Sequence, residues 1–349
     1  MTQDIPPIGV ALIGAGMIAR AHVAALSAIP ARATLRAAVS RHPDRARALA
    51  GAYTGKAPLF TSDLAAVAAD PAIDMAIVAT PPNVRHAVIT PFVDAGKPVL
   101  LEKPVARTLR EAEDIVTLCH RAGVPLGVVF QHRARAPSIA ATDLVDNGDL
   151  GALGLVEITV PLWRDQSYYD ELGRGTYARD GGGVMLTNAI HSLDLALSLA
   201  GPVTAVQAMT ATTPLHQMEA EDFAVAGLEF ACGASGSFVA STAMYPHRDE
   251  RIRLHFERAS LRIDKTSLDV AWRDGRRETR APVGTDAQIP PKFIKQMWHC
   301  AVIEDFIDAV QTGRAPMVTG RRALMSHAVI DAVETSARTG ARVAVPSAP

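Results

Sequence analysis

The chain opens with Ile8-Gly9-Val10-Ala11-Leu12-Ile13 and continues into Gly14-Ala15-Gly16-Met17-Ile18-Ala19. An apolar strand that ends in a Gly-x-Gly-x-x-Ala turn and enters a helix is the dinucleotide-binding fingerprint. The first glycine permits the tight turn, the second lets the backbone approach a pyrophosphate, and the alanine lets the helix pack on the strand. The unpaired N–H groups of the first helical turn favour phosphate. We therefore predict a nucleotide site at Gly14, Gly16, Met17 and Ile18. The alternative is a purely structural turn.

The composition restricts the class of protein. At 349 residues the chain is too long for one compact core, which predicts two domains. The formal net charge is −1, so the chain has no basic excess for nucleic acid, and we expect no nucleic-acid partner.

The cysteines and the apolar runs indicate a compartment. Cys119, Cys232 and Cys300 lack the spacing of a metal site, so we expect no metal, and their odd number suits a reducing environment. Residues 1–7 lack the apolar segment of a secretory signal, and no apolar run reaches the roughly 18 residues of a membrane span. We expect a soluble, cytoplasmic protein without a membrane partner.

Strand and helix patterns alternate in the first third of the chain. Strands are predicted at 34–39, 74–79, 99–101 and 126–130, and helices at 17–28, 43–50, 83–95 and 108–121. Strands separated by helices indicate βαβ units and a parallel sheet. We therefore predict a doubly wound, NAD(P)-binding Rossmann domain at 1–130.

Strand patterns dominate after residue 130. They lie at 153–160, 203–212, 223–230, 234–242, 251–257 and 261–263, with helices expected at 138–147, 183–199, 292–311 and 321–339. Successive strands without helices between them are typical of an open, largely antiparallel sheet. Alternating charges at 273–277 predict a solvated hairpin. The second domain, 131–349, is therefore predicted as α/β and assigned to substrate binding and oligomer formation.

The residues after the second strand bear on the choice of nucleotide. NAD enzymes usually carry an acidic residue there, which hydrogen-bonds the ribose hydroxyls. This chain has Ser40 and Arg41, with Arg45 close behind. A hydroxyl and two guanidiniums suit a 2′-phosphate, so we predict NADP as the preferred cofactor and NAD as the alternative. Both arginines could instead be solvated residues at a helix start.

Three further segments, together with the opening turn, resemble the Gfo/Idh/MocA family (glucose-fructose oxidoreductase, inositol dehydrogenase and related enzymes) over essentially the whole chain. They are Val78-Ala79-Thr80-Pro81-Pro82-Asn83 with His86, then Glu102-Lys103-Pro104, and Gly181-Gly182-Gly183 leading to His191 and Asp194. The resemblance implies a Rossmann domain, a second α/β domain with an open sheet, and hydride transfer between NAD(P) and a secondary alcohol or ketone. The substrate class that it implies is a sugar or cyclic polyol.

Lys103 corresponds to the active-site lysine of that family, and His191 to the histidine of its second domain. Pro104 matches a family proline that is often cis. Inositol-dehydrogenase-like members carry an aspartate four residues before the histidine, where this chain has Thr187, followed by Asn188. A hydroxyl can bind a sugar hydroxyl but cannot stabilise an imidazolium as a carboxylate does. The aspartate–histidine proton relay is therefore in doubt here.

Histidine suits proton acceptance because its ordinary pKa lies near working pH, and a lysine stabilises a developing alkoxide. We predict that His191 and Lys103 act on one substrate oxygen. The predicted contacts to the nicotinamide side of the cofactor are Thr80, Pro81, Asn83, His86, Glu102 and Lys103. The predicted substrate contacts are Lys103, Arg174, Thr187, Asn188 and His191.

Structural alternatives accompany these roles. His191 could be a satisfied core histidine, Lys103 a surface lysine, and His86 a residue of a helix surface. Glu102 could support its turn instead of the cofactor ribose. The aromatic and arginine-rich loop that carries Arg174 could equally cover a dimer interface.

Two other functions fit the same scaffold. One is an NAD-dependent glycosidase, in which tightly held cofactor transiently oxidises a sugar hydroxyl. The other is a non-catalytic NAD(P)-sensing regulator, which the retention of Lys103 and His191 disfavours. An open sheet usually needs covering, so we expect a homodimer or homotetramer with residues 223–242 near the contact.

Overall fold

The computed structural model describes residues 6–280 and 291–346, and the side chains of residues 45 and 291–295 lie outside that description. The chain forms two compact units. The first comprises residues 1–106, 110–131 and 290–320, and the second comprises 107–109, 132–289 and 321–349. The sequence-based division at residue 130 differs from this arrangement, because it assigns 290–320 to the second domain.

The first unit is built on a six-stranded parallel sheet with the order β3-β2-β1-β4-β5-β6. Its strands are β1 (Ile8–Ile13), β2 (Ala33–Val39), β3 (Leu59–Thr61), β4 (Met75–Val78), β5 (Val99–Glu102) and β6 (Leu126–Val129). β1, β4, β5 and β6 are buried along their whole length, which explains their continuous apolar sequences. The predicted doubly wound sheet is confirmed.

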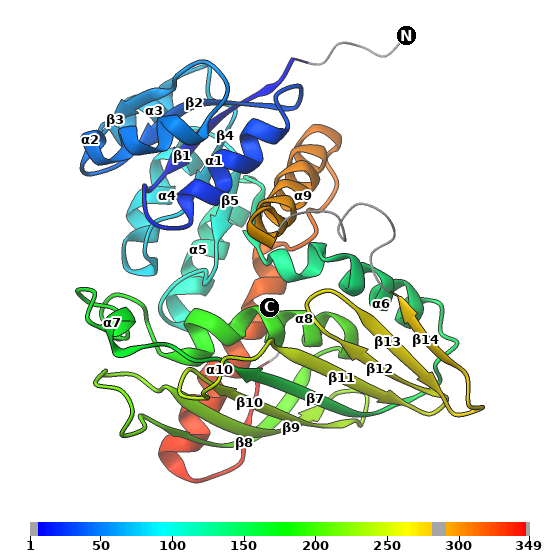
Figure 1. Cartoon of the computed structure of the whole chain (residues 1–349). Helices are drawn as coiled ribbons and strands as arrows, with labels where there is room; N and C mark the ends of the chain where they lie inside the picture. The colour runs from blue at the N-terminus through cyan, green and yellow to red at the C-terminus, as the bar shows by residue number, and fades with distance from the viewer. Residues whose placement is uncertain (1–5, 281–290, 347–349) are drawn as a thin grey trace. The chain divides into compact units, whose positions relative to one another are not determined.

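Helices of the first unit flank this sheet (Figure 1). They are α1 (Ala19–Ala28), α2 (Pro43–Ala46), α3 (Leu64–Ala69), α4 (Arg85–Asp94), α5 (Leu109–Arg121) and α9 (Pro291–Thr312). The predicted helix at 43–50 was wrong in its second half, because α2 ends at Ala46 and the chain continues as a 3-10 helix over Arg47–Ala52. Neither β3 nor α3 was predicted; both are short.

Helix α9 returns to the first unit from late in the chain. Its Phe306 is 1% exposed, and a Cβ atom on Gly127 of β6 would lie 2.6 Å from that ring. The amide of Val128 donates to the carbonyl of Val318, just beyond α9, at 3.0 Å. Gln296 donates to the carbonyl of Ala24 in α1 at 2.9 Å. The fit of a phenylalanine over a glycine explains why this segment belongs with the Rossmann sheet.

The second unit contains a nine-stranded sheet with the order β14-β13-β12-β11-β7-β10-β9-β8-β15. Its strands are β7 (Leu153–Pro161), β8 (Val203–Ala211), β9 (Phe223–Phe230), β10 (Ser235–Ser241), β11 (Arg251–Phe256), β12 (Ala259–Ile263), β13 (Leu268–Trp272), β14 (Arg277–Arg280) and β15 (Val343–Ala344). Among the strand pairings of the described residues in this sheet, only β7–β10 is parallel, so the predicted largely antiparallel sheet is confirmed. The charged turn at 273–277 joins β13 to β14, as predicted.

Helices of the second unit lie on one face of its sheet (Figure 1). They are α6 (Ala136–Asp146), α8 (Ile190–Ala200) and α10 (Gly320–Thr339), with a short α7 (Gln166–Tyr169) in the loop after β7. Strands β11 and β12 alternate buried with half-exposed residues, so the opposite face is open. Leu155 and Met209 are 41% and 57% exposed. Among the described residues, no helix is both long and apolar enough to cross a membrane.

The two glycines of the opening turn differ in what they require. Gly14 has φ +106°, and a Cβ there would lie 2.8 Å from the backbone carbonyl carbon of Ala79, whereas a Cβ on Gly16 would meet nothing within 4 Å. Gly14→Ala should therefore lower the free energy of unfolding by roughly 1–3 kcal/mol. Gly16→Ala should change it by less than about 0.5 kcal/mol. Urea unfolding of both variants is the measurement, and equal stability of the two would contradict this distinction.

Candidate active site

The turn after β1 has an exposed backbone. The amide of Gly14 donates to the carbonyl of Val39 at 2.8 Å, which fixes the start of the turn. Gly16 is exposed with open space above it, and Met17 is 77% exposed. Ala19 is fully buried, so α1 packs closely on the sheet. The turn therefore fits a dinucleotide pyrophosphate, because no described residue other than its chain neighbours lies within 4 Å of the position that a Cβ on Gly16 would take.

The end of β2 offers hydroxyl and guanidinium groups. The amide of Ser40 donates to the carbonyl of Thr61, and its hydroxyl accepts the amide of His42 at 3.2 Å. Arg41 is exposed, while the side chain of Arg45 lies outside the described part of the chain. The first acidic residue after this strand, Asp44, pairs with Arg47 at 3.3 Å. The positions of these residues do not test the predicted contact with a 2′-phosphate, which stays a prediction.

Arg85, the first residue of α4, holds together the loops that follow β4 and β5. It is 2% exposed, and its guanidinium donates to the carbonyl of Thr80 at 3.0 and 3.1 Å, to that of Glu102, and to that of Lys103 at 3.4 Å. Burial lowers the pKa of Arg85 to about 9, so it stays charged at neutral pH. The sequence does not reveal the role of Arg85, because a lone arginine at a helix start is usually solvated.

The other predicted cofactor contacts near the end of β4 differ from Arg85 in their exposure. Pro81, Asn83 and His86 are exposed, and His86 lies on the outer face of α4. Thr80 is half-buried, and its carbonyl is engaged by Arg85. Exposure leaves Pro81 and Asn83 accessible to a cofactor, so their predicted role stays a prediction.

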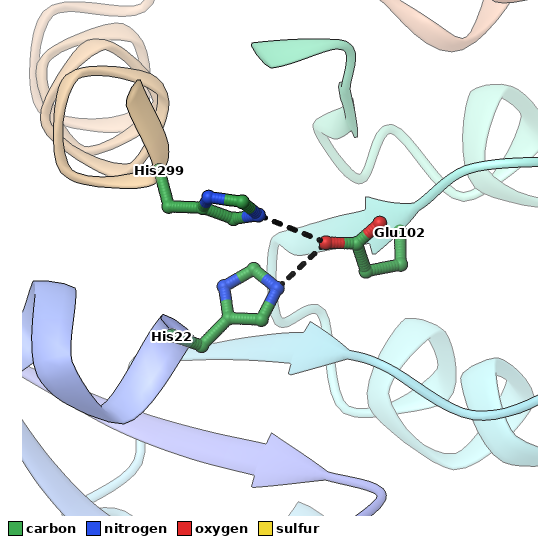
Figure 2. A group of neighbouring side chains, drawn as sticks. All are labelled: His22, Glu102 and His299. Carbon is green, nitrogen blue, oxygen red and sulfur yellow. Dashed lines mark hydrogen bonds and ion pairs between the residues drawn. The ribbon is translucent and has the colours of Figure 1, made fainter. Parts of the chain in front are cut away.

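Glu102 and Lys103 end β5 and begin the next loop. Glu102 is 5% exposed, and one of its carboxylate oxygens lies 2.8 Å from Nε2 of His22 (Figure 2). The other oxygen accepts the amide of Lys103 at 3.2 Å. The carboxylate therefore supports the turn, which was one of the two predicted roles. Lys103 is half-buried, and its bond to Pro104 is cis.

In the second unit, the triple glycine packs against a buried acid. A Cβ on Gly183 would lie 1.7 Å from the carbonyl oxygen of Glu221, and the carboxylate of Glu221 accepts the amides of Gly183 and Met185 at 2.9 and 3.0 Å. Glu221 is 5% exposed and lies two residues before the start of β9. The sequence does not reveal this contact, because it joins residues 38 positions apart.

The segment after the triple glycine carries the predicted substrate residues. A π-helical turn, Met185–Ala189, leads into α8, and such turns are frequent at functional sites. The Thr187 hydroxyl donates to the carbonyl of Gly183 at 2.6 Å and lies 2.9 Å from the side-chain oxygen of Asn188. Thr187, Asn188 and His191 thus share one short helical segment, and the structure brings these three predicted residues together.

His191 is held by residues of its own unit. It is 7% exposed, and its ring stacks on that of His132 with centroids 4.6 Å apart and an interplanar angle of 24°. One turn further along α8, Asp194 forms a two-pronged ion pair with Arg133 at 2.6 and 2.7 Å. These contacts orient α8 and its imidazole.

Arg174 lies in the loop after α7. Its guanidinium stands over the ring of Tyr168 at 4.3 Å, donates to the Tyr168 hydroxyl at 2.9 Å, and pairs with Glu171. The loop is therefore organised by its own polar contacts, and the predicted role of Arg174 toward substrate stays a prediction.

A second acid lies near the triple glycine. Burial, followed by repulsion from Glu221 and Asp331, raises the pKa of Glu334 in α10 to about 8. Burial also raises the pKa of Glu221, against the effect of the amides that it accepts. At neutral pH Glu334 is therefore largely protonated, which limits the negative charge beside the Glu221 carboxylate.

Comparisons with known proteins agree with both units. The profile described as "Oxidoreductase family, NAD-binding Rossmann fold" matches residues 8–130, and that of the "GFO/IDH/MocA C-terminal domain" matches residues 139–262. Inositol 2-dehydrogenase from Rhizobium meliloti is 28% identical over 335 residues, which cover 93% of this chain and 95% of the relative.

Two further relatives are similar over nearly their whole length. D-apiose dehydrogenase from Paraburkholderia graminis is 28% identical and covers 97% of this chain, with 89% of its own length matched. The crystal structure of the WlbA dehydrogenase from Bordetella pertussis, in complex with NADH and UDP-GlcNAcA, superposes with a TM-score of 0.83 at 28% identity, covering 97% of this chain and 99% of that one. The chain belongs to the Gfo/Idh/MocA family of NAD-binding, Rossmann-fold oxidoreductases.

Proposed function

We propose that this dehydrogenase transfers a hydride between NAD(P) and a secondary alcohol or ketone of a sugar or cyclic polyol. The observation that carries the proposal is the helical segment 187–191 of the second unit, where the π-helical turn meets α8. Thr187, Asn188 and His191 bring hydroxyl, amide and imidazole groups together there. Groups of this kind suit a substrate that carries several hydroxyls. The names of the inositol and apiose relatives support the same class.

The dinucleotide would be held by the turn of Gly14, Gly16, Met17 and Ile18, with Pro81 and Asn83 accessible on the neighbouring loop. When bound, the nicotinamide supplies the site that accepts or donates the hydride. The open backbone at Gly16 supports this assignment, because a pyrophosphate needs direct access to backbone N–H groups.

His191 is proposed to take the hydroxyl proton as the alcohol is oxidised. Its stacking on His132 and its place on α8 hold the imidazole in a fixed orientation, as a general base requires. Thr187 replaces a carboxylate and cannot stabilise an imidazolium, so its proposed role is to orient the substrate. Lys103 is proposed to stabilise the developing alkoxide through its ammonium charge.

Substitution of the two proposed catalytic residues tests this assignment. His191→Ala should reduce turnover by roughly 10²–10⁴-fold, the usual contribution of a positioned base. Lys103→Ala should be at least as damaging, because it removes the charge at the reacting oxygen. The cofactor Kd should change little in either variant. Thr187→Ala should reduce turnover less than either of these substitutions. The measurements are steady-state kinetics on a panel of inositols and D-apiose with cofactor titration. Near-normal turnover in His191→Ala would refute its role as base.

We further propose that NADP is preferred over NAD, which the absence of a carboxylate at 40–43 and the exposed Arg41 support. Arg41→Ala combined with Arg45→Ala should raise the Kd for NADP far more than that for NAD. Each charge-assisted phosphate bond contributes roughly 1.5–3 kcal/mol, or about one to two powers of ten in Kd. Isothermal titration of both cofactors measures this. A matching loss for both would assign the 2′-phosphate to other residues or to none.

A homodimer or homotetramer is proposed through the open face of the second sheet, near residues 223–242. Leu155 and Met209 support it, because they are exposed apolar side chains on strands of this sheet. Sedimentation at micromolar concentration should give a dimer or tetramer, and a monomer would contradict this proposal.

A cytoplasmic location is also proposed, with support from the three unpaired cysteines.

A further inference from the structure

Three side chains from distant parts of the sequence meet inside the first unit. His22 lies on α1, Glu102 ends β5 and His299 lies on α9; their residues are 0%, 5% and 1% exposed (Figure 2). Nε2 of His22 and Nε2 of His299 lie 2.8 and 3.6 Å from the same carboxylate oxygen. A carboxylate buried this deeply must be either paired or protonated.

The charges in this cluster balance without a further ion. Burial alone would raise the pKa of Glu102, but the two histidines hold it well below its usual range. Burial lowers the pKa of His22, so this ring is neutral and its Nε2–H donates to Glu102. The guanidinium of Arg85, which donates to the Glu102 carbonyl, supplies the compensating positive charge.

The two charged groups hold the main chain of Lys103 from both sides. The Glu102 carboxylate accepts the Lys103 amide at 3.2 Å, and the Arg85 guanidinium donates to the Lys103 carbonyl at 3.4 Å. His22, which fixes the carboxylate, lies on the helix that follows the nucleotide turn. The cluster therefore joins α1, α4, α9 and the end of β5 at the residue proposed to stabilise the alkoxide.

The same three groups have ligand atoms within 4.8 Å of one another, so a metal ion is the competing explanation. Two observations oppose it. Metal-bound histidines usually donate their second ring N–H to an acceptor, yet Nδ1 of His22 has no hydrogen-bond partner among the described residues. Arg85 already places a buried positive charge near Glu102, and a divalent cation would add excess positive charge there.

We propose that His22, Glu102 and Arg85 act as positioning residues that fix the Lys103 main chain, with a hydrogen bond from His22 holding the carboxylate in place. The inference rests on the proposed catalytic role of Lys103. None of the three residues needs to contact substrate.

The test compares His22→Leu, which removes the donor, with His22→Gln, whose side-chain amide can still donate to Glu102. In His22→Leu the hydrogen-exchange rate of the Lys103 amide should rise about tenfold or more. The reason is that the substitution loosens the hydrogen bond from this amide to the charged Glu102 carboxylate. The same variant should lower kcat by about 10–100-fold with cofactor Kd nearly unchanged, and His22→Gln should restore most of both. Ile115→Val, which removes one buried methylene from α5, controls for general loss of stability.

A double variant separates positioning from mere support of the fold. If His22 acts through Lys103, adding His22→Leu to Lys103→Ala should lower kcat no further than Lys103→Ala alone. Additive losses would overturn the proposal, as would wild-type exchange at the Lys103 amide in folded His22→Leu. Stoichiometric zinc or cobalt binding that disappears in His22→Leu would also overturn it, in favour of a metal centre.

A second variant covers the case in which His22→Leu fails to fold, and the activity of Lys103→Ala separates failure of the positioning role from failure of the catalytic role. If His22→Leu does not fold, Glu102→Gln tests the same claim at constant side-chain volume, with the same expected loss of amide protection and kcat. A fully active Lys103→Ala enzyme would defeat the proposed catalytic role of Lys103, on which the positioning role rests. An inactive Lys103→Ala with fully active His22→Leu would defeat only the positioning role.

Discussion

Buried charge at the carboxyl ends of β4 and β5 organises the first unit. The guanidinium of Arg85 bonds carbonyl oxygens on both loops, and the ionised Glu102 carboxylate beside it accepts a backbone amide. Removing either charge alone would lower the free energy of unfolding, because the other would then be buried without compensation. The conformation of the Glu102-Lys103 turn follows from this pair.

The second unit uses the same device with a different partner. Glu221 accepts two amides of the segment that begins at Gly183, and the missing side chain of Gly183 lets the two backbones approach. A buried carboxylate is costly unless such donors satisfy it, so the acid and the glycine depend on each other. In both units, then, a buried acid fixes the main chain of a segment that carries a residue proposed for catalysis, at Lys103 itself in the first unit and six residues before His191 in the second.

Sequence patterns revealed most of the fold because their causes are local. Fully buried parallel strands have continuous apolar sequences, and the Gly14 turn is imposed by a φ of +106° and a close approach to Ala79. Short elements such as β3 and α3 escaped prediction, since three to six residues carry little periodicity. The return of α9 to the first unit also escaped, because it depends on Phe306 packing over Gly127.

The candidate site likewise contains residues that the sequence reveals and residues that only the structure reveals. Lys103 and His191 stand in motifs that family resemblance exposes, whereas the residues that hold them, Arg85, Glu221 and His22, are visible only once distant segments are brought together. The central claim is that this chain moves a hydride between substrate carbon and nicotinamide. Carbon-deuterated inositols and D-apiose incubated with NADP or NAD, followed by mass spectrometry of the cofactor, test it most directly. The account predicts that the reduced cofactor gains one deuterium from at least one of these substrates. A cofactor that binds tightly yet acquires no deuterium from any of them would contradict it and favour a nucleotide-sensing role.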